Sequence, residues 1–156
     1  MRVSVMVRPG PWTGQRTVQA AVRRAWTELG HSLELVEFDP PPPPRGWLTR
    51  ADGSARRLAL AVPADHQVDP ARPESGPDRP DLMVGLIDAL EFRDGGGPWL
   101  GQVAARAGQA LAPLIVLAQR VAVSERELRG LGVEAAYAVD PAVPASWARV
   151  ARTWSW

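Results

Sequence analysis

The sequence predicts a three-layer α/β/α sandwich with a mainly parallel, Rossmann-like sheet. The stretch from Pro80 to Val139 alternates short apolar runs with segments of helical length, which is typical of βαβ units. Within it, the glycine run Gly95–Gly97 opens a helical segment, as in loops that lead from a strand into a helix. The chain has 156 residues, of which 46% are hydrophobic and 22% charged, values ordinary for one globular domain. We therefore expect a single α/β domain over residues 1–156, with a proline-rich connection and a hairpin at 40–80.

The amino-terminal part is expected to supply a strand, a helix and a second strand. Arg2–Val7 is a continuous apolar run that predicts a buried strand. Apolar residues then recur at helical spacing over Thr13–Leu29, with Thr13 as the candidate cap and Gly30 as the stop. Leu33–Phe38 alternates in polarity and predicts the second strand.

The middle of the chain predicts a connection. Five consecutive prolines, Pro40–Pro44, indicate a stiff polyproline II spacer, with a recognition motif for a partner as the less favoured alternative. Trp47–Arg50 and Ala55–Val62 flank Asp52-Gly53, a dipeptide typical of hairpin turns. Residues 63–80 contain five prolines among polar neighbours and predict a long surface loop.

The carboxyl-terminal half predicts three further strands and three helices. A capping box formed by Ser124 and Glu127 marks the start of the second of these helices. Right-handed crossovers between the strands then place helices on both faces of the sheet. The expected elements are strands at Leu82–Ile87, Leu114–Ala118 and Glu134–Val139, and helices after Pro98, over 124–131 and over Pro144–Thr153.

Charge and residue usage exclude several classes of function. The 18 basic residues are all arginine and nearly balance 17 acidic ones, so neither nucleic acid nor a membrane is an expected partner. The absence of lysine excludes Schiff-base chemistry and the lysine of a P-loop. The absence of cysteine excludes thiol catalysis and thiolate zinc sites. With no signal peptide or long apolar segment evident, a cytoplasmic location is expected.

Two loops at the carboxyl ends of predicted strands are candidate anion sites. Backbone N–H groups at the start of a helix bind phosphate or carboxylate, and an arginine beside them would assist. An ordinary helix cap at the first loop and a flexible strand-to-helix loop at the second are the favoured alternatives. The candidate anion-binding residues are Thr13, Gly14, Gln15, Arg16, Gly95, Gly96 and Gly97.

Acidic residues, a histidine and tryptophans suggest three further hypotheses. Asp88, Glu91 and Asp94 follow the third main strand and could bind Mg²⁺ through their carboxylates, although solvated loop acids are the favoured interpretation. Asp65 and His66, with Asp69, would offer a metal site or proton relay, but their proline-rich loop favours solvated side chains. Tryptophans at expected loop or terminal positions indicate a protein–protein surface, for a protein partner or a homo-oligomer; they are Trp12, Trp47, Trp99 and Trp156.

Two blocks of the chain are similar to a known family. The second block comprises Asp81–Asp88, Gly95–Gly97, Val103–Ala107, Ala112–Ala118 followed by Gln119-Arg120-Val121, Ser124–Leu131 and Gly132–Val139. In order and spacing it resembles the end of the glycerate kinase family of the bacterial glycerate 2-kinase type. The opening MRVSVMVRPGPWTGQ also resembles the strand and loop at the start of that family. The resemblance implies an α/β domain made of the family's two terminal segments, with a short connection replacing the substrate-bearing middle.

Departures from the family pattern decide what function the resemblance implies. Gly10-Pro11-Trp12-Thr13 stands where the family has Asp-Ser-Phe-Lys, and Gly85-Leu86-Ile87-Asp88 where it has Gly-Glu-Gly-Arg. Phosphoryl transfer depends on such charges for positioning and electrostatics. We therefore expect a degenerate, non-catalytic module that binds a small organic acid or phosphate metabolite, or a protein. The alternatives are a glycerate kinase using ATP and Mg²⁺, alone or with a partner chain, and a purely structural, dimer-forming protein.

Overall fold

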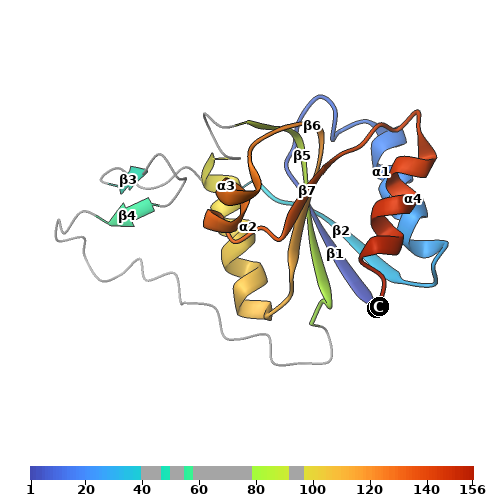
Figure 1. The fold of residues 1–156 in the computed structure, drawn as a ribbon, viewed down its shortest axis with the longest axis horizontal. Helices are drawn as coiled ribbons and strands as arrows, with labels where there is room; N and C mark the ends of the chain where they lie inside the picture. Colours follow the sequence, from blue (N-terminus) through green and yellow to red (C-terminus); the bar gives the residue numbers. More distant parts are fainter. Residues whose placement is uncertain (40–46, 50–54, 58–78, 92–96) are drawn as a thin grey trace.

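Five parallel strands form the central sheet of the computed structural model, which describes residues 1–39, 47–49, 55–57, 79–91 and 97–156 (Figure 1). Every neighbouring pair of strands in this sheet runs parallel. The predicted α/β class with a mainly parallel sheet is therefore confirmed. In spatial order the strands are β2 (Ser32–Glu37), β1 (Arg2–Val7), β5 (Leu82–Glu91), β6 (Leu114–Ala122) and β7 (Ala135–Ala138).

Helices cover both faces of the sheet and complete the three layers (Figure 1). Helices α1 (Arg16–Thr27) and α4 (Pro144–Thr153) lie on one face, where the core includes the buried side chains of Trp26 and Trp147. Helices α2 (Gly97–Ala110) and α3 (Glu125–Gly130) pack on the other face around Trp99, Leu100 and Leu128. The sheet is thus buried from both sides, as expected for strands joined by helical crossovers.

Burial along the strands follows their position in the sheet. The first six residues of β5, Leu82–Ile87, are all buried, and so are the first five of β6. Such continuous apolar runs suit central strands that are covered on both faces. The edge strand β2 alternates instead, with Ser32, Glu34 and Glu37 exposed. Charged side chains on an edge strand discourage pairing with another chain.

Among the described residues, three element boundaries differ most from the sequence expectation: the ends of β5 and β6 and the start of α1. Strands β5 and β6 run about four residues further because they pair with each other to the end, from Ala89 with Arg120 to Glu91 with Ala122. Helix α1 begins at Arg16, not at Thr13, and its N-cap is Gln15. Thr13 does not cap the helix because its hydroxyl donates to the carbonyl oxygen of Arg8 at 2.6 Å.

Several local stop and start signals act as predicted. Gly30 ends its helix as expected, with a positive φ angle of 78° that glycine adopts without strain, and Gly132 follows α3 in the same conformation with a φ of 72°. Ser124 and Glu127 form the capping box at the start of α3. The predicted hairpin pairs β3 (Trp47–Thr49) with β4 (Ala55–Arg57) in antiparallel fashion. The proline run at 40–44, the turn at 52–53 and the loop at 63–78 lie outside the described residues.

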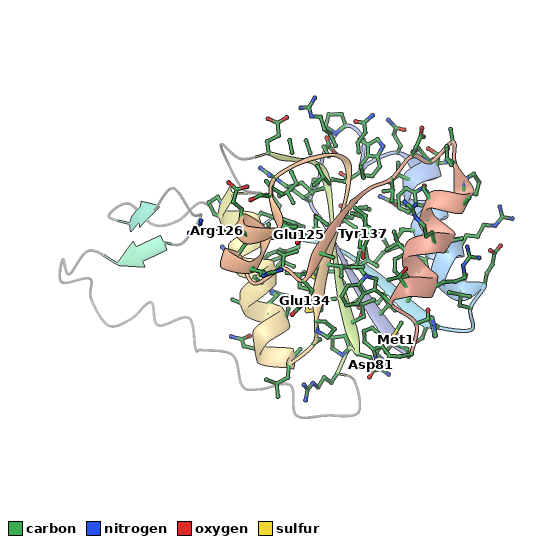
Figure 2. The ribbon with its side chains drawn as sticks, in the orientation of Figure 1. Met1, Asp81, Glu125, Arg126, Glu134 and Tyr137 are labelled. Atoms are coloured by element: carbon green, nitrogen blue, oxygen red, sulfur yellow. The ribbon has the colours of Figure 1, made fainter. Side chains whose placement is uncertain are left out.

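The amino ends of the central strands meet at one edge of the sheet, where Figure 2 labels Met1 and Asp81. The backbone N–H of Arg2 donates to Asp81 Oδ2 at 2.7 Å, which fastens the start of β1 beside the start of β5. The carboxyl ends of all five strands therefore lie together at the opposite edge. Within the described residues, no helix combines the length and apolar character that crossing a membrane requires.

Candidate functional site

The strand order reverses between β1 and β5, and this point defines the candidate site. From β1 the chain crosses to β2 on one side, whereas from β5 it proceeds to β6 and β7 on the other. In open parallel sheets, ligands bind outside the carboxyl ends of the strands at such a switch point. In this protein the edge is built by the loop Arg8–Gln15 after β1 and by the end of β5.

The carboxylate of Asp88 is held inside the loop that follows β1. The backbone N–H of Thr13 donates to Asp88 Oδ1 at 2.9 Å, and that of Trp12 donates to Oδ2 at 3.3 Å. Successive N–H groups that converge on one point form a concavity suited to an anion. Here the anion is a side chain of the protein's own β5, so the loop already has an acidic occupant.

Hydrogen bonds within the loop hold this arrangement. The Gly14 N–H donates to the carbonyl oxygen of Gly10 at 2.8 Å, and the Arg8 N–H donates to that of Leu86 at 2.9 Å. Thr13 is fully buried, and its hydroxyl donates to the Arg8 carbonyl. The loop is therefore a packed turn anchored on β5.

Aromatic stacking joins this loop to α4 and to the loop after β7, on the face of the sheet that α1 and α4 cover. The rings of Trp12 and Trp147 are stacked with centroids 6.1 Å apart and planes 17° apart. The indole N–H of Trp147 donates to the carbonyl oxygen of Asp140, which follows β7, at 2.7 Å. The loops after β1 and β7 therefore contact each other through these two rings, over the core that α1 and α4 cover. The indole nitrogen of Trp12 is buried and has no partner among the described residues.

The remaining candidate anion ligands lie at the starts of α1 and α2 or fall outside the described residues. Gly14, Gln15 and Arg16 are exposed at the start of α1, and the Gln15 side chain makes no capping hydrogen bond. Gly97 begins α2 with a φ of 59°. Gly95 and Gly96 lie outside the described residues, so the second loop stays a prediction.

The candidate metal ligands have protein partners of their own. Asp88 accepts the two loop N–H groups, and Glu91 forms an ion pair with Arg120 of β6. Asp94, like Asp65, His66 and Asp69, lies outside the described residues. Within the part of the chain that the structure describes, no three acidic or histidine side chains are grouped so that they could hold a metal ion. A magnesium site involving Asp94 stays a prediction.

The expectation of a tryptophan-rich surface is wrong for two of its four members. Trp12 and Trp99 are only 4% and 3% exposed, because each folds back from its loop or helix start into a core. The Trp99 indole N–H donates to the Phe38 carbonyl oxygen at 2.6 Å, and its ring packs over Gly85. Trp156 is 67% exposed, as expected for a terminal residue. The side chain of Trp47 lies outside the description.

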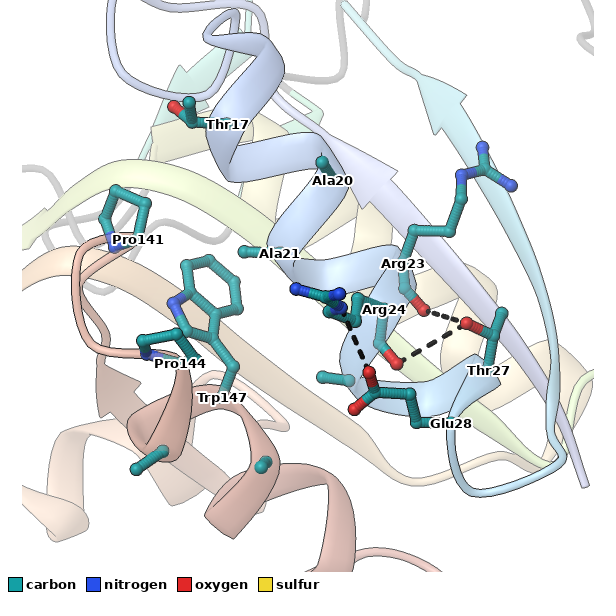
Figure 3. Close-up of a pocket in the computed structure, with 13 residues that line it drawn as sticks. Thr17, Ala20, Ala21, Arg23, Arg24, Thr27, Glu28, Pro141, Pro144 and Trp147 are labelled. Atoms are coloured by element: carbon teal, nitrogen blue, oxygen red, sulfur yellow. Dashed lines mark hydrogen bonds and ion pairs between the residues drawn. The ribbon is translucent and has the colours of Figure 1, made fainter.

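A groove between α1 and α4 is a feature that the sequence reasoning missed. It has a volume of about 780 Å³ and a largely apolar lining (Figure 3). Figure 3 shows Trp147 pointing from α4 toward α1, with the Arg24–Glu28 ion pair beside it. We call this feature the α1/α4 groove; among its lining residues are Ala20, Ala21, Arg24, Pro144, Trp147 and Ala148. The sequence signal that could have indicated the groove is the presence of alanines at partly exposed positions of both helices.

Replacing Gly10 with alanine is expected to lower the free energy of unfolding by about 1–3 kcal/mol. A Cβ atom at this position would lie 2.6 Å from the Asp88 carboxylate oxygens, so either the loop or Asp88 must shift. Urea unfolding measures the change. Gly108→Ala is the matched control, because a Cβ there meets nothing within 4 Å and the residue lies within α2. A loss at Gly10 no larger than at Gly108 would contradict the close approach of Asp88.

Comparison of this chain with known protein families, with curated proteins and with solved structures finds no match. The resemblance to glycerate kinases therefore stays a prediction from the sequence. What the chain does must be inferred from its own geometry, above all from the position of Asp88 at the switch point.

Proposed function

We propose that this chain is a degenerate, glycerate-kinase-like module without catalytic activity, and that it acts by binding another protein. Of the two non-catalytic roles considered, metabolite binding and protein interaction, one observation favours the second. The N–H groups of Trp12 and Thr13, at the switch point of the sheet, are bound by the Asp88 carboxylate. Rossmann-like domains ordinarily hold their anionic ligands at that position.

Electrostatics supports this choice. A ligand carboxylate or phosphate 4 Å from the Asp88 carboxylate would be repelled by about 1 kcal/mol per charge pair in water, and by about 4 kcal/mol near a protein surface. The anion would also have to replace the two N–H donors that Asp88 already uses. Arg16 is the cation nearest in sequence on the α1 side of the loop, and it is exposed.

A kinase at this edge would need positive charge near the phosphate, whereas Asp88 places a carboxylate there. Phosphoryl transfer relies almost entirely on positioning and on neutralising the phosphate oxygens. The chain has no lysine, and Asp88 adds negative charge at the strand ends. These features support a non-catalytic role over the alternative of a glycerate kinase completed by ATP, Mg²⁺ or a partner chain.

A thermal-shift panel with ATP, ADP, glycerate and phosphoglycerate, each with and without Mg²⁺, tests the proposal. We expect none of these ligands to raise Tm at millimolar concentration, whereas a ligand at a hundred times its Kd would add about 2.7 kcal/mol of stability. A Mg²⁺-dependent shift with ATP would overturn the proposal in favour of the kinase. A shift with glycerate or phosphoglycerate alone would overturn it in favour of metabolite binding. Arg16→Ala is the control, because it should abolish a shift that arises at the β1 loop.

A further inference from the structure

The α1/α4 groove has a floor of small apolar side chains. Ala25 and Trp147 are buried beneath it, while Ala20, Ala21 and Ala148 line it with no atoms beyond Cβ. Helices pack with their axes 8–10 Å apart, and small residues at the contact allow the closer spacings. The small side chains of the groove would therefore allow a third helix to pack closely between α1 and α4 (Figure 3).

The two helices that form the groove are strongly basic. Together α1 and α4 carry five arginines and no acidic residue, although the whole chain has a net charge of only +1, so the rest of the chain carries −4. One of the five arginines, Arg24, is paired with an acid: its Nε lies 3.0 Å from Glu28 Oε1. Within the described part of the chain, the other four form no ion pair; they are Arg16, Arg23, Arg149 and Arg152.

The arginines are placed around the apolar floor. Arg23, Arg24 and the acidic Glu28 line the groove on the α1 side, and Arg24 is paired with Glu28. On α4, Arg152 follows Ala148 by four residues and therefore lies on the same side of the helix, one turn further along. Arg23 and Arg24 on α1 and Arg152 on α4 all lie toward the carboxyl-terminal ends of their helices. An occupant would meet apolar contacts along the floor and, at that end, a positive charge that Glu28 reduces but does not cancel.

We propose that the α1/α4 groove binds an acidic amphipathic helix of a partner protein. This inference rests on the proposed function as an interaction module and names the chemistry of its partner. Helix-in-groove recognition uses an apolar face set into the groove, while charges around it fix the partner and its orientation. Helices α1 and α4 have 12 and 10 residues, or about 18 and 15 Å at 1.5 Å per residue, which matches a partner helix of about three turns.

A protein helix suits the groove better than a nucleic acid, the other polyanion that arginines attract. Single-stranded nucleic acid binds through exposed aromatic rings on which bases stack, and the ring at this floor, Trp147, is only 1% exposed. Arg23 and Arg24 also line the groove, however, and their guanidinium groups would attract phosphates. Nucleic acid is therefore an outcome that the test must be able to reveal.

The test uses nuclear magnetic resonance titration of the full chain with three 14-residue capped peptides. The first places leucine at helical spacing on one face and glutamate elsewhere, the second has lysine for each glutamate, and the third scrambles the first so that its leucines share no face. We expect the first peptide to shift amide signals of α1 and α4 and to bind at least tenfold more tightly than the other two. Equal binding of the three peptides, shifts outside α1 and α4, or tighter binding of a 12-nucleotide single strand would overturn the proposal.

Introducing a negative charge at two alanines supplies matched variants. Ala20→Glu adds an acid to the lining at an exposed position of α1, and should weaken the acidic peptide at least tenfold. Ala105→Glu makes the same change at an exposed position of α2, on the other face of the sheet, and should leave binding unchanged. Equal effects of the two would overturn the groove as the site. If no ligand of the thermal-shift panel raises Tm and no peptide binds, the groove proposal alone is overturned. If a nucleotide raises Tm, the proposed function is overturned, whether or not the peptides bind.

Discussion

Replacing Trp147 with alanine is expected to lower the free energy of unfolding by about 3–5 kcal/mol. Trp147 is 1% exposed, stacks on Trp12 and donates its indole N–H to the Asp140 carbonyl oxygen. Truncation removes the stacking and the hydrogen bond, and it leaves a cavity between α1, α4 and the sheet. Urea unfolding, followed by far-ultraviolet circular dichroism so that the signal does not depend on the missing indole, measures the loss.

Two further tryptophan variants show which interaction matters most. Trp147→Phe keeps an aromatic ring beside Trp12 but loses the hydrogen bond to Asp140, so its loss should be smaller than that of Trp147→Ala. Trp156→Ala is the matched control, because Trp156 is 67% exposed and its loss should stay within about 0.5 kcal/mol. If Trp147→Ala and Trp156→Ala cost the same, Trp147 does not join the β1 loop to α4 as described.

Local sequence signals were sufficient for most of the fold. The apolar runs of β1 and β6, the helical spacing in α1 and the capping box at Ser124 each depend on residues close together in the chain. The predicted strand ends were wrong where pairing with a neighbouring strand determines them. The last residues of β5 and β6 are strand only because they pair with each other, and polar residues such as Arg120 carry no strand signal of their own.

The candidate site could be predicted only in pieces. The sequence marked Thr13 as an anion ligand and Asp88 as a metal ligand, yet these two residues bind each other across a separation of 75 positions. No local pattern reports such a contact, because it depends on β1 and β5 lying side by side. The α1/α4 groove was missed for the same reason: its alanines come from two helices more than a hundred residues apart.

Replacing Asp88 with alanine is expected to lower the free energy of unfolding by about 2–3 kcal/mol, because the N–H groups of Trp12 and Thr13 lose a charged acceptor. Asp88→Asn keeps one oxygen acceptor and should lose less. Glu91→Gln is the control on the same strand: its ion pair with Arg120 is largely exposed, so the change should stay below about 1 kcal/mol. Urea unfolding measures all three variants, and equal losses for Asp88→Ala and Glu91→Gln would contradict the role given to Asp88.

The same variant also tests why the switch point is closed to anions. If the Asp88 carboxylate is what occupies the loop, removing it leaves two N–H donors facing a vacated position, and inorganic phosphate should raise the Tm of Asp88→Ala but not that of the parent chain. Gly10→Ala combined with Asp88→Ala should then cost less than the sum of the single changes, since the added Cβ no longer meets a carboxylate. Phosphate stabilisation of the parent chain equal to that of the variant would mean that Asp88 does not exclude anions, and it would contradict the non-catalytic role proposed for this edge.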